Sequence, residues 1–330
     1  MGDRYCEKEE MHYEMAVQHY EMGKVLGKGR FGEVRLVTHR ESGGVYACKI
    51  AGDAKNRRVL LQEAEIQREI TTAVRESGES TLVFPLFREW IDAGDCSFLI
   101  MEYVEGTPLA ARLQGGEGTK GSGEKKAARR EVQNREVQNG KVQNREVQNR
   151  KVQHREGRLT REEMTDIAGQ LAEGLMLLHE RPEPILYRDL KPEHVILCGD
   201  GRVRLLDLGC ACRLSEAWKS KAGSPGYAAP EQLCERGHRQ GVYSDVYSFG
   251  KVLAAMQRET GADRDWERLI AQCTAEKTEE RIPGMRFILQ ELRTIRRGMP
   301  RKHAAWMQFQ VQKCVCCPHQ SSYRDGYQSG

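Results

Sequence analysis

Hydrophobic and polar side chains alternate in the first part of the chain. The runs 34–38 and 45–49, which a Ser42-Gly-Gly44 turn joins, have the spacing typical of two strands of a β-hairpin. Side chains two residues apart on a strand point to the same face, so Ala47 and Lys49 are expected to face the same side. The chain is therefore expected to begin with β-structure.

Helical spacing begins near residue 160. Thr160 and Glu163 form the pattern of a capping box, in which each side chain bonds to the backbone N–H of the other residue. Apolar residues then recur at intervals of three and four, which predicts a helix with one buried face. The residues of this face are Met164, Ile167, Leu171, Leu175 and Leu178. A β-rich first part and an α-rich second part indicate an α+β fold with two lobes.

The pattern breaks down within residues 114–157. A glycine-rich stretch precedes a five-residue unit, repeated over 131–155, whose single valine steps around a helix instead of forming a stripe. So little apolar surface cannot offset the entropy of ordering the segment. We interpret 114–157 as a low-complexity pentapeptide-repeat insertion, which acts either as a spacer or as a docking or self-association arm. It interrupts a domain of residues 20–297, flanked by a polar lead-in at 1–19 and a tail at 298–330.

Composition excludes several classes of protein. The 330 residues are 39% hydrophobic and 30% charged. The sequence contains no run of about 18 uncharged apolar residues, so no membrane span is expected. The formal net charge is +4, and 114–157 carries the basic excess, so the folded part shows no basic stripe for nucleic acid. The eleven cysteines are scattered, which favours a reducing, cytoplasmic setting over a disulfide framework. Nothing in the pattern specifies an oligomeric state.

A glycine-rich loop precedes the predicted hairpin. It has the pattern G-x-G-x-F-G-x-V, with fixed positions at Gly27, Gly29, Gly32 and Val34. Glycines let backbone N–H groups approach phosphate oxygens without interference from a Cβ atom. Alone, the pattern is as typical of a structural turn as of a phosphate-binding loop. The next strand strengthens the phosphate interpretation, because Lys49 would face whatever the loop covers.

Further motifs follow in a fixed order. They are Tyr187-Arg-Asp-Leu-Lys-Pro-Glu-His194, a hairpin with the turn Gly199-Asp-Gly201, Asp207-Leu-Gly209, Gly223-Ser-Pro-Gly-Tyr-Ala-Ala-Pro-Glu231 and Ser244-Asp-Val-Tyr-Ser-Phe-Gly250. Together with the glycine loop, these motifs resemble the eukaryotic-type (Hanks-type) serine/threonine protein kinase family. The resemblance covers about 20–297 without the insertion, and the ordered set is far more specific than any single motif.

The resemblance implies a bilobal protein kinase-like fold, with a β-rich N-lobe, a mainly helical C-lobe and ATP between them. It also implies transfer of the γ-phosphate of ATP to Ser and Thr hydroxyls of protein substrates, with autophosphorylation and with Mg²⁺ as the metal. Lys191, two residues after Asp189, and the Gly223–Tyr227 segment favour the serine/threonine branch over the tyrosine branch.

The implied nucleotide site draws on both lobes. Lys49 would hold the α- and β-phosphates, and its expected partner on the following helix is Glu63, with Glu65 and Glu69 as alternatives. The hinge would offer backbone groups to adenine. The implied ATP-binding positions are Gly27, Gly29, Gly32, Val34, Ala47, Lys49, Glu63, the hinge residues Glu102 and Val104, and Ile196 beneath the purine.

The implied catalytic residues are Asp189, Lys191 and Lys49. Asp189 would accept or orient the proton of the substrate hydroxyl, and Lys191 would lie near the γ-phosphate. Asp207 would bind the metal.

The resemblance also implies two structural roles. Glu231 would pair with Arg281 to hold the C-lobe together, and Asp245 would brace the catalytic loop.

One position departs from the chemistry of the family. His194 stands where the family has an Asn that binds a second metal, and imidazole suits later transition metals better than Mg²⁺. Three outcomes remain open: one Mg²⁺ on Asp207, with His194 bonded only to the catalytic loop; a preference for Mn²⁺; or a weak or inactive kinase, which in the inactive case is a nucleotide-binding pseudokinase that acts as a scaffold. Retention of Lys49, Asp189 and Asp207 favours the enzyme.

Overall fold

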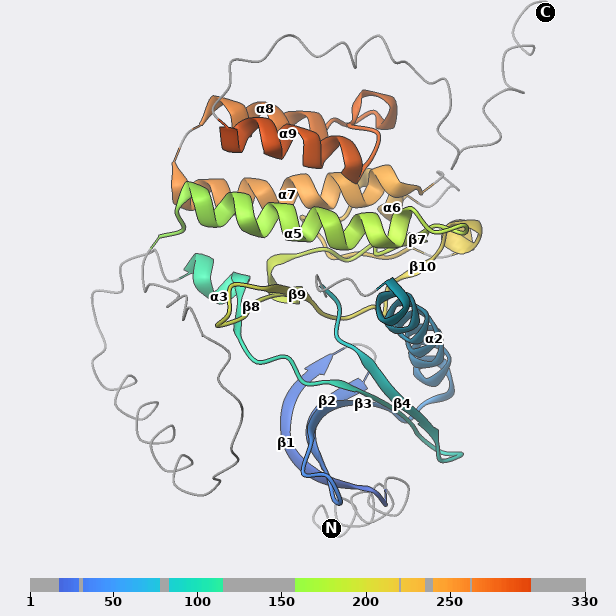
Figure 1. The fold of residues 1–330 in the computed structure, drawn as a ribbon. Coiled ribbons are helices and arrows are strands. Elements are labelled where there is room, and N and C mark those ends of the chain that lie inside the picture. The colour runs from blue at the N-terminus through green and yellow to red at the C-terminus, as the bar shows by residue number, and fades with distance from the viewer. Residues whose placement is uncertain are drawn as a thin grey trace, which may run out of the picture.

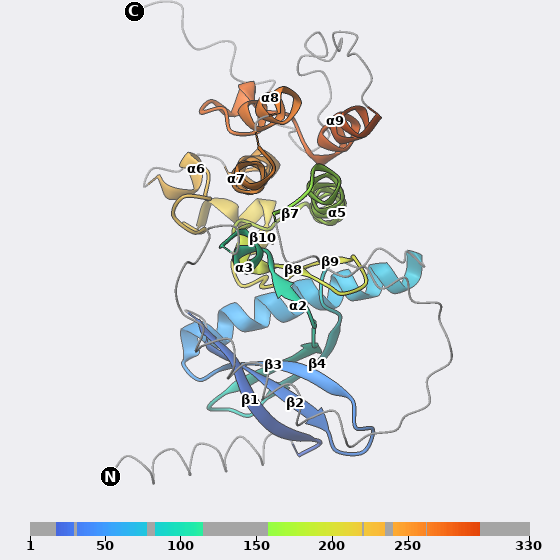
Figure 2. The ribbon, with the colours of Figure 1, turned by 90° about the vertical axis from the view of Figure 1, so that its left-hand side faces the viewer.

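The structure is a computed structural model that describes residues 18–29, 32–77, 83–114, 158–219, 221–234, 240–261 and 263–297. These residues form a β-rich lobe and a mainly helical lobe, which lie at opposite ends of the molecule in both views (Figures 1 and 2). The predicted α+β fold with two lobes is therefore confirmed. Apart from a few edge residues, the predicted lead-in, insertion and tail lie outside the described residues.

The β-rich lobe contains a five-stranded antiparallel sheet within the described ranges. Its strands are β1 (Tyr20–Gly29), β2 (Gly32–His39), β3 (Val45–Ala51), β4 (Phe87–Asp92) and β5 (Ser97–Glu102), in the spatial order β1-β2-β3-β5-β4. The first predicted hairpin is confirmed, since Val34 of β2 pairs with Lys49 of β3. Ala47 and Lys49 are both buried, as expected for residues on one covered face.

Helix α2 (Ala54–Ser77) packs against the sheet and also reaches the other lobe (Figure 2). Leu60 and Ala64, one helical turn apart, form a buried cluster with Ala51 and Leu99 of the sheet. A second stripe of the helix belongs to the core of the helical lobe. It consists of Ile66, Ile70 and Val74. Movement of α2 would therefore disturb packing in both lobes.

The larger lobe is built from helices packed around one apolar core. They are α3 (Leu109–Gln114), α5 (Arg161–His179), α6 (Pro230–Leu233), α7 (Val242–Thr260), α8 (Arg264–Cys273) and α9 (Met285–Arg297). The predicted face of α5 is confirmed, because all five of its apolar residues are buried. The capping box is also present: Glu163 N donates to Thr160 Oγ1 at 3.1 Å, and Thr160 N donates to Glu163 Oε2 at 2.8 Å.

Short strands lie between the sheet and the helices (Figure 1), and 3-10 turns lie in loops of the helical lobe. The strands are β6 (Thr107–Pro108), β7 (Ile185–Leu186), β8 (Val195–Leu197), β9 (Val203–Leu205) and β10 (Cys212–Arg213), and the turns are η1 (Pro192–His194), η2 (Leu214–Lys219) and η3 (Thr278–Glu280). Strands β8 and β9 form the second predicted hairpin, with Ile196 opposite Arg204. Because β9 ends at Leu205, it delivers Asp207 to the boundary between the lobes.

Two negative findings apply to the described ranges. No helix there combines the length and the apolar character needed to cross a membrane. No disulfide joins any of the cysteines found there.

Candidate active site

Lys49 lies between two carboxylates that come from different lobes. Its Nζ atom is 2.7 Å from Glu63 Oε2 on α2 and 2.8 Å from Asp207 Oδ1 after β9. Burial alone would lower the pKa of Lys49, but the carboxylates of Glu63 and Asp207 raise it above its ordinary value. The structure thus contains the expected Lys49–Glu63 ion pair. The alternative partners are engaged elsewhere or exposed: Glu69 pairs with arginines, and Glu65 faces solvent.

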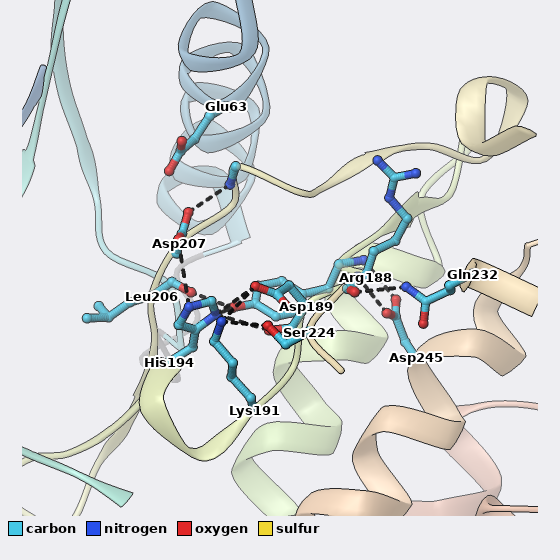
Figure 3. Close-up of polar contacts among 12 residues, drawn as sticks. Glu63, Arg188, Asp189, Lys191, His194, Leu206, Asp207, Ser224, Gln232 and Asp245 are labelled. Carbon is cyan, nitrogen blue, oxygen red and sulfur yellow. Dashed lines mark hydrogen bonds and ion pairs between the residues drawn. The ribbon is translucent and has the colours of Figure 1, made fainter. Parts of the chain in front are cut away.

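The two carboxylate oxygens of Asp207 have different neighbours. Oδ1 accepts hydrogen bonds from Lys49 Nζ and, at 3.0 Å, from the backbone N–H of Gly209. Oδ2 lies 3.7 Å from His194 Nε2 (Figure 3). Burial would raise the pKa of Asp207, but the Lys49 ammonium and the hydrogen bond from Gly209 N outweigh it and hold the pKa at about 2. Asp207 is therefore ionised at neutral pH.

Two residues of the site adopt left-handed backbone conformations. Arg188 has φ 65° and Asp207 has φ 63°, and no other non-glycine residue in the described ranges has a positive φ. Such conformations cost about 1–3 kcal/mol each and persist only where the surroundings fix them. The fully buried Asp245 accepts hydrogen bonds from the backbone N–H groups of Tyr187 and Arg188, at 2.8 and 2.7 Å. Asp245 thus braces the peptide that precedes Asp189.

Asp189 presents one bonded and one unbonded carboxylate oxygen. Oδ2 accepts a hydrogen bond from Lys191 Nζ at 3.1 Å, and the same ammonium donates to Ser224 Oγ at 2.7 Å (Figure 3). Oδ1 is buried and has no hydrogen-bond partner among the described residues. A buried acceptor without a hydrogen bond costs about 1–3 kcal/mol, so such acceptors are rare in natural proteins and often belong to functional sites. Asp189 Oδ1 is therefore placed to accept a hydrogen bond from a molecule other than this chain.

Gln232 joins the segment after Asp207 to the catalytic loop, a contact that the sequence analysis did not anticipate. Its buried Nε2 donates to the carbonyl oxygens of Arg188, at 2.8 Å, and of Ala222, at 3.3 Å. Gly223 allows this approach, because its φ is 108° and a Cβ atom would lie 2.9 Å from the Arg188 oxygen. Ser224 was also missed, although it lies inside a quoted motif. The sequence holds no signal for Gln232, because its burial and its partners appear only in the structure.

His194 is surrounded by the other polar groups of the site. Its Nδ1 atom lies 3.0 Å from the backbone oxygen of Asp189 and 3.3 Å from the Tyr187 hydroxyl. Burial lowers the pKa of His194, although the Asp207 carboxylate opposes this effect. The two residues predicted to bind metal are therefore neighbours.

The donor set fits a metal held jointly by protein and nucleotide. No group of three or more His, Cys, Asp and Glu side chains suited to a metal occurs in the part of the chain that the structure describes. The site offers two side chains of these types, His194 and Asp207. Mg²⁺ commonly keeps several waters and takes only one or two protein carboxylates together with phosphate oxygens. The Asp207 carboxylate is thus compatible with the metal that the family uses, whereas the imidazole of His194 is a less suitable ligand for it.

The glycine loop closes the β1–β2 hairpin. Gly29 pairs with Gly32, and the intervening residues 30–31 lie outside the described ranges. Gly32 has φ 137°, and a Cβ atom there would lie 1.9 Å from the carbonyl oxygen of Ile50, so no other residue fits without a shift. At Gly27 and Gly29 a Cβ atom would meet nothing within 4 Å, which leaves their backbone accessible from outside.

The expected hinge is tied to the helical lobe by a side-chain contact. The carboxylate of Glu102, at the end of β5, pairs with the buried Arg204 of β9 and accepts a hydrogen bond from Leu86 N at 3.0 Å. Val104 follows two residues later, and Ile196 is buried on β8 opposite Arg204. The sequence predicted the positions of the hinge but not Arg204, because nothing in the chain marks it as a partner of Glu102.

A comparison with protein families bears on this arrangement. The family model described as the protein kinase domain matches residues 20–137 and 136–264. The chain belongs to this family. In the terms of the family, the β-rich lobe is the N-lobe and the helical lobe is the C-lobe.

Curated relatives agree with this assignment. CBL-interacting protein kinase 21 of Oryza sativa subsp. japonica is 26% identical over 274 residues, which is 82% of this chain and 43% of that protein. Serine/threonine-protein kinase PEPKR2 of Arabidopsis thaliana is 26% identical over 239 residues, 72% of this chain and 39% of that protein. Beta-adrenergic receptor kinase 1 of Homo sapiens is 25% identical over 306 residues, 88% of this chain and 37% of that protein. The chain spans about two fifths of the length of these relatives.

Proposed function

We propose that the chain is an ATP-dependent kinase that phosphorylates Ser and Thr hydroxyls of protein substrates, including its own. The observation that carries the proposal is the catalytic loop, where the buried Asp189 Oδ1 has no partner among the described residues and Lys191 lies beside Oδ2. The Lys191–Ser224 hydrogen bond and the serine/threonine kinase among the relatives support the Ser/Thr specificity.

In the proposed mechanism, Asp189 orients the substrate hydroxyl and takes its proton as the hydroxyl oxygen attacks the γ-phosphorus. The new O–P bond forms while the bond between the γ-phosphorus and the bridging oxygen breaks, and ADP leaves with the electron pair. Lys191, 3.1 Å from Asp189 Oδ2, places a positive charge near the transferring group. Magnesium, held by Asp207, would supply charge neutralisation on the phosphates when it is bound. Lys49 orients the α- and β-phosphates, so catalysis rests on positioning and charge.

Asp189→Asn is expected to lower kcat for phosphate transfer by about 100-fold or more, the usual scale for a positioned general base. The amide keeps the size of the side chain but cannot take the proton. Transfer from γ-labelled ATP to a protein acceptor measures the rate, and mass spectrometry maps the modified residues.

Asp200→Asn, in the half-exposed β8–β9 turn, is the matched control and is expected to keep wild-type turnover. Equal rates for Asp189→Asn and wild type would contradict the role of Asp189. A wild-type chain that binds ATP analogues and phosphorylates neither itself nor any protein would instead be a pseudokinase scaffold.

We also propose that catalysis does not need the 114–157 insertion, of which only Gln114, the last residue of α3, is kept in the deletion variant below. The two segments of the family match meet at residues 136–137, inside the repeats, which supports this view. Removing 115–157 and joining Gln114 to Arg158 through a short Gly-Ser linker is expected to leave the melting temperature and autophosphorylation nearly unchanged. The free-energy cost of closing a loop changes by only about 0.6 kcal/mol per doubling of loop length. Thermal denaturation and the labelled-ATP assay measure the two quantities, and an unfolded or inactive variant would show a structural role.

The proposed setting is the cytoplasm, and the proposed partners are protein substrates. The described cysteines form no disulfide, and burial raises the pKa of the Cys48 and Cys273 thiols, which keeps them protonated and inert. Cell fractionation tests the compartment.

A further inference from the structure

The groups around His194 determine which of its ring nitrogens carries the proton. The backbone oxygen of Asp189, 3.0 Å from Nδ1, can only accept a hydrogen bond. The Tyr187 hydroxyl donates to the carbonyl oxygen of Leu206, so towards Nδ1, at 3.3 Å, it presents its oxygen as an acceptor. Two acceptors at Nδ1 place the proton of the neutral ring on Nδ1, and in this tautomer Nε2 carries a lone pair.

The lone pair of Nε2 faces a carboxylate. Nε2 lies 3.7 Å from Asp207 Oδ2, which is too long for a hydrogen bond. Two electron-rich atoms that face each other in a buried site repel unless a cation lies between them. Lys49 does not fill this place, because it binds the other oxygen, Oδ1.

The spacing of these two atoms suits a single metal ion. Donors bound to one ion at about 2.1 Å each lie at most about 4.2 Å apart. The separation of 3.7 Å between Nε2 and Oδ2 is within that limit. Neighbouring ligands of an octahedron lie about 3.0 Å apart, so a shift of about 0.7 Å would bring both atoms onto one ion. The hydrogen bond from Nδ1–H to the Asp189 carbonyl is the kind of outer contact that orients a histidine ligand.

We propose that His194 Nε2 and Asp207 Oδ2 form a mixed nitrogen–oxygen site that makes this kinase favour Mn²⁺ over Mg²⁺. Magnesium prefers oxygen ligands only, whereas an imidazole ligand raises the affinity for divalent transition metals. Manganese accepts this nitrogen and also the phosphate and water oxygens that complete an octahedron. The inference rests on the proposed ATP-dependent function, because the nucleotide supplies the remaining ligands.

The test uses the full-length protein with a non-hydrolysable ATP analogue. Electron paramagnetic resonance follows the free Mn²⁺ signal during titration, and competition with Mg²⁺ gives the ratio of the two affinities. His194→Asn is expected to lower the Mn²⁺/Mg²⁺ affinity ratio by about tenfold or more, the scale on which changes around a metal site act. His39→Asn makes the same substitution at the end of β2 and is expected to keep the wild-type ratio.

A second readout does not depend on the folding of any variant. Wild-type protein labelled with ¹⁵N at histidine is expected to show a ¹⁵N coupling in the pulsed spectrum of the Mn²⁺–nucleotide complex. Nucleotide binding with no such coupling and with equal affinity ratios for wild type and His194→Asn overturns this inference alone. No binding of the analogue with either metal overturns the proposed function, and the inference with it.

Discussion

Lys49→Met is expected to lower the rate of phosphate transfer by about a thousandfold, the upper end of what one preorganised charge contributes. The Lys49 ammonium is the cation that Glu63 Oε2 and Asp207 Oδ1 share, at 2.7 and 2.8 Å. Methionine fills similar space without a charge. It therefore removes the group that would hold the phosphates and leaves two carboxylates without their common partner. Transfer from labelled ATP, with the melting temperature of each variant, measures the effect.

Two further variants separate chemistry from folding. Lys49→Arg keeps the positive charge but not the compact ammonium, so activity is expected to fall while the fold is retained. Lys277→Met removes a lysine whose side chain is 68% exposed, and it is expected to leave transfer unchanged. Wild-type rates in both Lys49 variants would contradict the enzyme as proposed.

The Lys49–Glu63 contact shows what the sequence can predict. The period of two along β3 places Ala47 and Lys49 on one face, and both are buried there. The family resemblance pointed to Glu63 over Glu65, and the structure has the ion pair with Glu63, whereas Glu65 faces solvent. Local periodicity was sufficient here because each residue faces the site through its own regular element.

Contacts between segments that are distant in the sequence could not be predicted in the same way. Gln232 of α6 bonds to the carbonyl of Arg188, 44 positions earlier in an irregular loop. Arg204 pairs with Glu102 over 102 positions. These partners depend on how the lobes and loops pack, which no local pattern records. For His194 the sequence identified the departure from the family, but only the positions of Asp189 and Tyr187 give the tautomer.

Arg281→Met is expected to destabilise the fold by about 3–5 kcal/mol, the usual cost of removing one partner from a buried ion pair. Arg281 is fully buried and forms the predicted pair with Glu231, with Nη1–Oε1 2.6 Å and Nη2–Oε2 3.0 Å. Its remaining N–H groups donate to backbone carbonyl oxygens. The carbonyls belong to Tyr243, Ala275 and Glu276. Since every donor is used, methionine would remove all five bonds at once and leave the buried Glu231 carboxylate with the hydrogen bond from Ser244 Oγ but without a counter-ion.

A matched ion pair on the surface provides the control. Arg286 also forms a two-bond contact, with Glu180, but its side chain is 67% exposed. Arg286→Met is therefore expected to leave the midpoint of urea denaturation close to that of wild type, because solvent screens exposed pairs. The double variant Glu231→Leu/Arg281→Met should recover part of the loss, since it removes the buried carboxylate that has lost its counter-ion, while the bonds from Arg281 to the three carbonyls stay lost. Equal midpoints for Arg281→Met and Arg286→Met would show that the buried pair does not hold the C-lobe together.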